Sequence, residues 1–213
     1  MGVHLGGKIS FLIIFLIPII FSQMVEPLWS EDNPNYKKCL ENPNKEVATI
    51  CLISTGNTLS KEGKYKEAEQ AFKEAIKISS KSGIKANAYL SLGNTLGRQE
   101  KYSEAIGFLQ KAVKIDPELG SAWHDLGVAY FKIGKFDGAI QAFKRAISVT
   151  KIDWIIDNSY LNLTYIYLIK MDASNTKKDY EILHNRNPIL ATKFLSELEE
   201  NPKLWKKFQS FTE

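Results

Sequence analysis

The chain has 213 residues, of which 44% are hydrophobic and 24% charged, a balance that is typical of a folded globular protein and too apolar for intrinsic disorder. Its formal net charge of +4, from 28 basic and 24 acidic side chains, is too small and too evenly spread to indicate nucleic-acid binding. Two cysteines exclude a disulfide-dense scaffold and a zinc site of four thiolates, and three widely separated histidines give little basis for a metal, cofactor or catalytic site.

The first predicted element is an apolar run at residues 9–21 (ISFLIIFLIPIIF), which follows a single lysine, Lys8. The run is shorter than the roughly 20 residues that cross a bilayer as a helix, and Pro18 would interrupt it. This pattern is typical of a secretory signal. We therefore expect residues 1–30 to be a signal peptide and the protein to be exported, either periplasmic or secreted. An uncleaved membrane anchor through residues 9–21 and a buried core helix are the alternatives.

Residues 31–46 are expected to form a linker and a short N-terminal capping helix. Asn33-Pro34 and Asn42-Pro43 each place a helix-capping residue before a proline, which predicts a short helix at 34–40 and the start of a longer one near 43. Cys39 lies in the short helix, and Cys51 lies on the face that this helix would cover. In an oxidising compartment we expect a disulfide between Cys39 and Cys51, and two buried free thiols are the alternative.

Between residues 47 and 190 the sequence repeats with a period of about 34 residues. Two columns of small residues carry the period, and successive members lie 37, 34 and 37 residues apart. Between these columns, apolar residues recur at spacings of three and four, as on the buried face of a helix. The pattern predicts an all-α protein built from stacked pairs of antiparallel helices, because one such unit cannot bury its apolar face alone. The columns are Gly56, Gly93, Gly127, Thr164 and Ala68, Ala105, Ala139, Thr176.

The third unit carries the clearest motif: Trp123, Leu126, Gly127, Tyr130, then Gly134, Phe136, Ala139, Phe143, Ala146. This pattern resembles the tetratricopeptide repeat family, whose unit has Trp-x2-Leu-Gly-x2-Tyr followed by Ala-x3-Phe-x2-Ala. The resemblance covers about two thirds of the chain and implies an α-α superhelix, a tetratricopeptide repeat solenoid. Its four units would span residues 49–82, 86–119, 120–153 and 157–190.

The fourth unit departs most from the family pattern, since Thr164, Met171, Thr176 and Leu183 replace smaller residues there. Larger side chains in the tight columns suggest a terminal unit that leans on a cap. Residues 188–199, with Phe194 and Leu198 on one side, would supply this cap, and residues 202–211 would add a second short helix. We therefore expect C-terminal capping helices within residues 191–213.

The resemblance implies binding of a protein or peptide, not catalysis, on an inner wall lined by the first helix of each unit. At its start this wall offers amides and cations for a peptide backbone, and at its end it offers apolar contacts. The alternative for the late apolar residues is that they pack under the C-terminal cap. Inward-facing positions also include Lys61 and Lys132. The candidate partner-binding residues are Asn57, Asn94, Arg98, His124, Asp125, Phe131 and Tyr165.

Two specialised functions are not favoured. The clamp that some members of this family use for the C-terminal carboxylate of a chaperone matches only at Asn57, because its other positions hold Ile53, Ser91, Ser121 and Asp125. A Ser121–His124 catalytic pair is also unfavoured, because neighbours on one helix rarely converge on a substrate and no oxyanion motif is visible. We therefore predict a noncatalytic scaffold or adaptor. A membrane-tethered assembly factor that recruits envelope proteins is the alternative, and the oligomeric state is left open.

Overall fold

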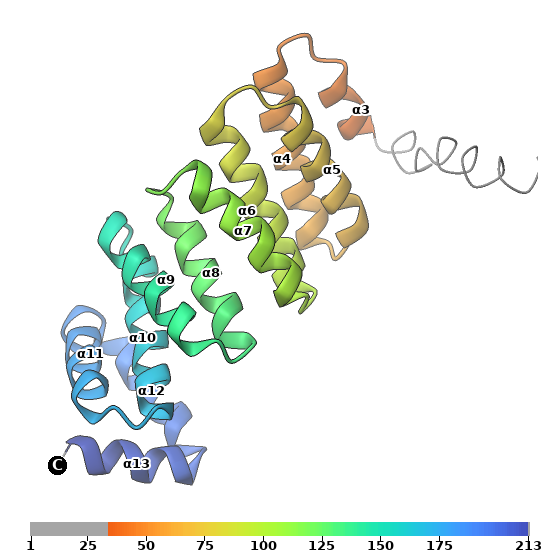
Figure 1. The fold of residues 1–213 in the computed structure, drawn as a ribbon. Helices are drawn as coiled ribbons and strands as arrows, with labels where there is room; N and C mark the ends of the chain where they lie inside the picture. The colour runs from red at the N-terminus through yellow and green to blue at the C-terminus, as the bar shows by residue number, and fades with distance from the viewer. Residues whose placement is uncertain (1–33, 213) are drawn as a thin grey trace, which may run out of the picture.

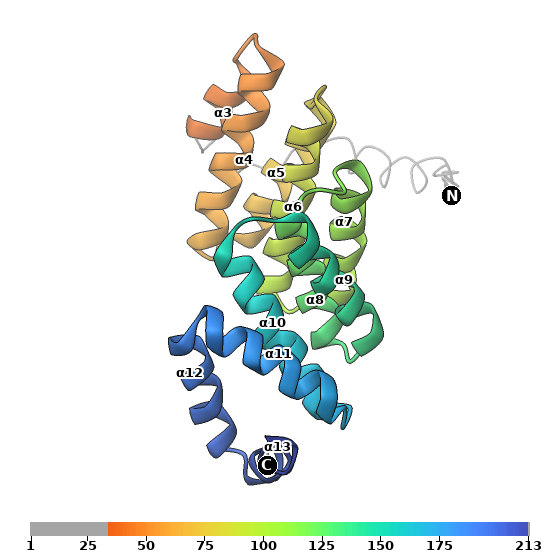
Figure 2. The ribbon, with the colours of Figure 1, turned by 90° about the vertical axis from the view of Figure 1, so that its left-hand side faces the viewer.

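The computed structural model describes residues 34–212, which form helices α3 to α13 and, within that range, no strand. The helices stack in chain order into a curved array, from α3 at the upper right to α13 at the lower left of Figure 1. Figure 2 shows the same array from the side. This arrangement confirms the predicted all-α superhelix with helices capping its C-terminal end.

Each repeat unit is one antiparallel pair of helices. A short helix precedes the four pairs, and two helices follow them. The bounds are α3 Pro34–Leu40; α4 Lys45–Lys61 and α5 Tyr65–Ile78; α6 Ser82–Arg98 and α7 Tyr102–Ile115; α8 Gly120–Lys132 and α9 Phe136–Val149; α10 Asp153–Ile169 and α11 Ala173–Arg186; α12 Pro188–Glu199; and α13 Pro202–Thr212.

The predicted signal peptide at residues 1–30, including the apolar run at 9–21, lies outside the described residues. Among the residues that are described, no helix is both long enough and apolar enough to cross a membrane.

The start of α4 differs slightly from the sequence-based expectation. Its N-cap is Asn44, whose Oδ1 accepts hydrogen bonds from the backbone N–H groups of Glu46 and Val47 at 3.0 and 3.3 Å. Asn42 does not cap the helix. Its Oδ1 instead accepts from the Asn44 N–H at 2.9 Å, which forms a turn just before the helix begins.

Close approach of the two helices within a unit explains the glycine column. A Cβ added at Gly127 would lie 2.8 Å from Cδ1 of Phe143, and one at Gly93 would lie 2.7 Å from Cγ of Leu109. Both distances are far below van der Waals contact, so these positions exclude any side chain unless the buried partner moves. The fourth unit holds Thr164 in this column, with its hydroxyl donating to the Tyr160 carbonyl at 2.9 Å.

The two ends of the array are covered in different ways. At the N-terminal end, α3 packs on α4, and Cys39 is buried in a cluster with Tyr36 and Leu52. At the C-terminal end, α12 and α13 pack against α10 and α11. The apolar cluster there joins Leu168 to Phe194, and includes Leu198 and Phe208.

The contacts between helices of different units identify the inner wall. First helices of successive units touch one another directly, as α4 touches α6, α6 touches α8 and α8 touches α10. The second helices, α5, α7, α9 and α11, make their main contacts with first helices. Because the first helices lie closer together, they form the inside of the curve and the second helices form the outside.

Candidate partner-binding groove

Two adjoining hollows follow the inner wall across the first three units. The first, of about 320 Å³, lies between α4 and α6 and is lined by Asn57, Asn94 and Arg98. The second, of about 210 Å³, lies between α6 and α8 and is lined by Asn94, Arg98 and Asp125. Since Asn94 and Arg98 line both hollows, the two form one groove, which we call the inner groove. It brings together four of the seven predicted partner-binding residues.

The floor of the inner groove is well ordered by packing between first helices. Ser60 on α4 and Thr95 on α6 are both buried, and the Thr95 hydroxyl lies 3.0 Å from the Ser60 hydroxyl in a hydrogen bond. This bond satisfies both buried hydroxyl groups and links two consecutive units. The side chains above it, Asn57 and Asn94, therefore project from a fixed base.

Three basic residues occupy equivalent places along the inner groove. Lys61, Arg98 and Lys132 are the last residues of α4, α6 and α8, and they are separated by the same 37 and 34 residues as the glycine column. None of them forms an ion pair with a carboxylate anywhere between residues 34 and 212. The groove therefore carries positive charge that no described carboxylate neutralises by direct pairing.

His124 does not lie open in the inner groove as predicted. Only 8% of it is exposed, and its ring makes edge contacts with Phe143 on α9 and Trp154 on α10, both with centroids 5.6 Å away. Its Nδ1 lies 3.2 Å from Oδ1 of Asp125, while its Nε2 is buried without a hydrogen-bond partner among the described residues. His124 is thus a packed residue that orients Asp125, not a direct contact for a partner.

Tyr165 is also occupied by the protein itself. Its hydroxyl donates to Oε2 of Glu197 at 2.6 Å, and its ring stands edge-on to Phe194 at 4.8 Å, so α12 covers it. Burial, together with this hydrogen bond, raises the pKa of the Tyr165 hydroxyl well above its usual value. Leu161 and Leu168 belong to the same cluster. The late apolar wall therefore packs under the C-terminal cap, which was the alternative interpretation.

Phe131 holds an intermediate position. It is half-buried, with its ring 6.0 Å from that of Phe136, and it packs on the cluster of the third and fourth units. The inner groove thus ends near Phe131, where the fourth unit begins. Of the seven predicted partner-binding residues, four line the inner groove, whereas His124, Phe131 and Tyr165 pack wholly or partly against the protein itself.

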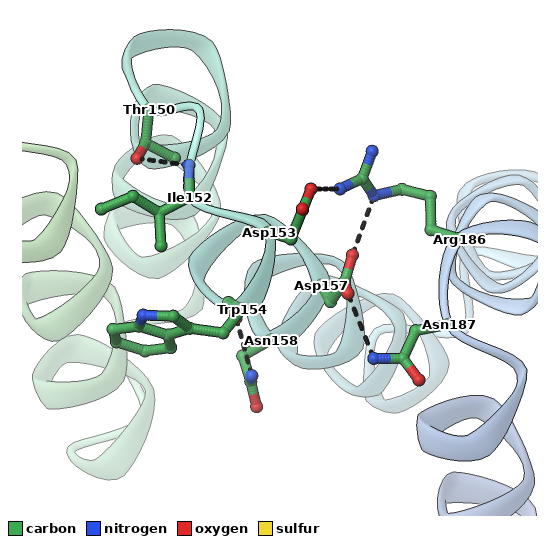
Figure 3. Close-up of polar contacts among 8 residues, drawn as sticks. All are labelled: Thr150, Ile152, Asp153, Trp154, Asp157, Asn158, Arg186 and Asn187. Atoms are coloured by element: carbon green, nitrogen blue, oxygen red, sulfur yellow. Dashed lines mark hydrogen bonds and ion pairs between the residues drawn. The ribbon is translucent and has the colours of Figure 1, made fainter.

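Trp154 is an exposed aromatic residue beside the inner wall, and it is not among the predicted partner-binding residues. It lies in the first turn of α10, with 55% of its surface exposed, and Figure 3 shows its side chain extending away from α10 toward the neighbouring helix. Its contact with the His124 ring identifies that helix as α8. Trp154 stands outside the repeat motif, so the periodic pattern gave no signal for it.

The junction between α10, α11 and α12 is held by a polar network (Figure 3). The Arg186 guanidinium bridges two carboxylates on α10, with Nε 2.8 Å from Asp157 and Nη2 2.9 Å from Asp153. Hydrogen bonding to Asp157 raises the pKa of Arg186. Asn187, the N-cap of α12, donates from Nδ2 to the other Asp157 oxygen at 3.1 Å. This network fixes the direction in which the cap leaves the last unit.

A larger hollow, of about 910 Å³, lies beside the disulfide-linked end of the array. The structure joins Cys39 to Cys51, with their Cα atoms 5.4 Å apart. Because α3 has only seven residues, it covers the start of α4 and leaves the face around Ser54 and Thr58 open to this hollow. No cluster of three or more potential metal ligands occurs in residues 34–212.

Comparison with known proteins agrees with this fold. Family models of the tetratricopeptide repeat match residues 49–118 and residues 120–149. Among curated proteins, none matches the chain in sequence.

Solved structures share the arrangement of helices. MamA is 25% identical, with a TM-score of 0.62, over 74% of this chain and 87% of the MamA chain. YrrB, described as a TPR protein with an unusual peptide-binding site, is 19% identical, with a TM-score of 0.61, over 83% and 90% of the two chains. BtubC from P. vanneervenii is 15% identical, with a TM-score of 0.63, over 84% of this chain and 85% of the BtubC chain. The described part of this chain therefore carries tetratricopeptide repeats, folded as the solenoid that the sequence predicts.

Proposed function

We propose that the protein is a noncatalytic scaffold that binds an extended segment of a partner protein in the inner groove. The observation that carries this proposal is the continuity of the two hollows across three repeat units through the shared residues Asn94 and Arg98. An extended segment suits such a groove, because it can touch every first helix in turn. The description of YrrB as peptide-binding supports the same mode of interaction.

The residues of the inner groove have separate roles in this proposal. Asn57 and Asn94 each offer a carbonyl and an amide group, which match the N–H and C=O groups of a bound backbone. Arg98 stands between the two hollows and adds up to five donors in a fixed geometry. Within residues 34–212 none of these three side chains is part of a hydrogen bond or ion pair that holds the helices together, so the described part of the fold leaves all three available to a partner.

We further propose that the protein acts outside the cytoplasm. The apolar run at residues 9–21 and the cysteine pair support export, since disulfides persist in oxidising compartments. A membrane-tethered assembly factor, held by an uncleaved run at 9–21, is the second candidate. N-terminal sequencing of the protein isolated from its host separates the two, because a tethered protein retains Met1 or Gly2 and a cleaved one begins near residue 31.

Comparison of three proteins tests the role of the inner groove. Partners are captured on the wild type, on a groove variant (Asn57→Ala, Asn94→Ala, Arg98→Ala), and on a control variant (Lys66→Ala, Lys114→Ala, Lys177→Ala). The control lysines lie exposed on second helices. The groove variant should lose the partner while keeping the wild-type helicity and melting temperature. Loss in the control variant alone would place the interaction on the outer face and overturn the proposal.

A further inference from the structure

The charge of the inner groove is repeated in step with the fold. Lys61, Arg98 and Lys132 end α4, α6 and α8, and each is the equivalent residue of its unit. The fourth unit has Ile169 at this position. The ladder of three cations, which we call the basic ladder, therefore ends where the cap closes the inner wall.

The lining of the two hollows shows how the basic ladder meets the groove. Lys61 and Arg98 both line the first hollow, and Arg98 and Lys132 both line the second. Asp125 is the single carboxylate residue lining either hollow, and its Oδ1 lies 3.2 Å from Nδ1 of His124. The lining thus carries three positive charges against one negative charge that is already hydrogen-bonded.

The outer face of the protein is different. Several of its cations are paired with carboxylates on the same or the adjacent unit, while others, such as Lys66 and Lys114, form no ion pair within residues 34–212. Lys73 lies 3.3 Å from Glu69, and Arg145 lies 2.8 Å from Glu118. Carboxylates therefore accompany part of the positive charge on the outer face, whereas the lining of the inner groove holds three cations and a single carboxylate. A partner that complements the inner groove must itself supply the negative charge.

We infer that the segment bound in the inner groove is an acidic internal stretch of a protein, whose carboxylate side chains pair with Lys61, Arg98 and Lys132. This inference rests on the proposed function. Between the ion pairs, Asn57 and Asn94 hydrogen-bond the backbone of the segment. The Asp125 carboxylate, in the hollow between Arg98 and Lys132, accepts a backbone N–H.

The geometry predicts the spacing of the acidic residues. Helices in contact lie about 8–10 Å apart, and a segment extended in the polyproline II conformation advances about 3.1 Å per residue and brings every third side chain back to the same face. Carboxylates that meet successive cations of the basic ladder are therefore about three residues apart. Asp125 disfavours a nucleic acid in the groove, because a continuous phosphate backbone would place negative charge next to the negative Asp125 carboxylate.

Fluorescence anisotropy with defined peptides tests the inference on the full chain. The probe is an extended peptide of about twelve residues with both ends blocked and Glu at every third position. A second peptide carries Gln at the same positions, and a thymidine dodecamer serves as the nucleic-acid probe. Blocked ends remove the terminal carboxylate, so that only the side-chain charges of the peptide affect its affinity. The Glu peptide should bind about tenfold or more tightly than the Gln peptide, and its affinity should fall as salt rises.

Two variants of equal net charge connect binding to the basic ladder. Lys61→Glu/Arg98→Glu/Lys132→Glu should lose at least about tenfold in affinity for the Glu peptide. The matched control, Lys66→Glu/Lys114→Glu/Lys177→Glu, should bind as the wild type does. If the three cations of the basic ladder only stabilise the ends of their helices, the first variant should have a lower melting temperature and an unchanged affinity for the Glu peptide. That result would overturn the inference.

The remaining outcomes separate this inference from the proposed function. Equal affinity for the Glu and Gln peptides, with binding still lost in the ladder variant, would refute an acidic ligand and leave the groove as the binding site. No binding of the Glu peptide at about 1 mM would also refute the acidic ligand. Equal or tighter binding of the thymidine dodecamer would assign the ladder to nucleic acid. Loss of binding in the control variant alone would overturn both the inference and the proposed function.

Discussion

In each of the four units, one residue in the turn between the two helices adopts the same unusual backbone conformation. Gly63, Glu100, Gly134 and Met171 have φ of 79°, 60°, 73° and 63°, in the left-handed region. The residue after each donates its N–H to a carbonyl five residues earlier, as Lys135 does to Tyr130 at 2.9 Å. This is the bonding of a Schellman turn, which favours glycine. Two units adopt it with a residue that carries a Cβ, Glu100 in the second and Met171 in the fourth.

Replacing the strained residues should stabilise the protein. Glu100→Gly and Met171→Gly should each raise the free energy of unfolding by about 0.5–1 kcal/mol, because a left-handed conformation is costly for residues with a Cβ. Gly134→Ala, the reverse change in an equivalent turn, should lower it by about 1–2 kcal/mol. Urea denaturation of the three variants measures both effects. Destabilisation by Glu100→Gly would mean that its side chain makes a contact worth more than the strain.

One carboxylate in the last unit is expected to make stability depend on pH. Asp179 on α11 is buried, and this burial raises its pKa to about 6. Lys178 and Lys144 act against the shift, and Asp172 adds to it. Since the pKa is higher in the folded than in the unfolded state, Asp179 stabilises the fold when protonated. That contribution is complete below about pH 4 and is lost as the pH rises through about 6.

The matching variant is Asp179→Asn, which removes the charge and nearly preserves the shape. Its free energy of unfolding, relative to that of the wild type, should increase between about pH 4 and pH 7 and level off above that range. Thermal unfolding at a series of pH values measures this difference. Glu181→Gln, on the exposed side of the same helix, is the control. A difference that stays constant across the series would show that Asp179 does not titrate in this range.

At the scale of helices, the sequence predicted the second helices and the caps well, because their positions follow from periodic apolar residues and from proline or glycine at the ends. The short helix at 34–40 agrees with α3 for the same reason. The start of the first helix was harder to delimit in three of the four units. α4, α6 and α10 begin at Lys45, Ser82 and Asp153, each four residues before the unit that the family pattern suggested, because the motif does not contain this extra turn.

The link between α3 and α4 is tested by removing its disulfide. Closing a loop between cysteines 12 positions apart in the sequence stabilises a chain by about 3 kcal/mol in the chain-entropy model, so Cys39→Ser/Cys51→Ser should lower the free energy of unfolding by up to that amount. Hydrogen exchange should rise first in α3, which has seven residues. Mass measurement of the unreduced protein after alkylation is the control. Two alkylated thiols in natively purified protein would contradict the bond.

At the scale of the whole molecule, the sequence predicted the solenoid, because the solenoid depends on columns that recur in register. The same columns indicated which residues face the inner wall, whose role in binding stays a prediction. The sequence left open which parts of that wall the protein covers itself. Tyr165 faces inward by its position in the repeat, but α12 returns over it. His124 likewise occupies an inward position and is covered by Trp154. Both differences arise from long-range packing of nonrepeated segments, for which a repeat pattern carries no information.

The most direct test of the inner groove is photo-crosslinking from single positions in the full-length protein expressed in its host. A photoreactive amino acid replaces Asn94, which lines both hollows, or Lys66, which lies exposed on α5. Mass spectrometry then identifies the crosslinked partner and the segment attached. We predict a discrete adduct from position 94, mapping to one extended segment of a partner, and none from position 66. Adducts from position 66 alone would contradict binding in the inner groove.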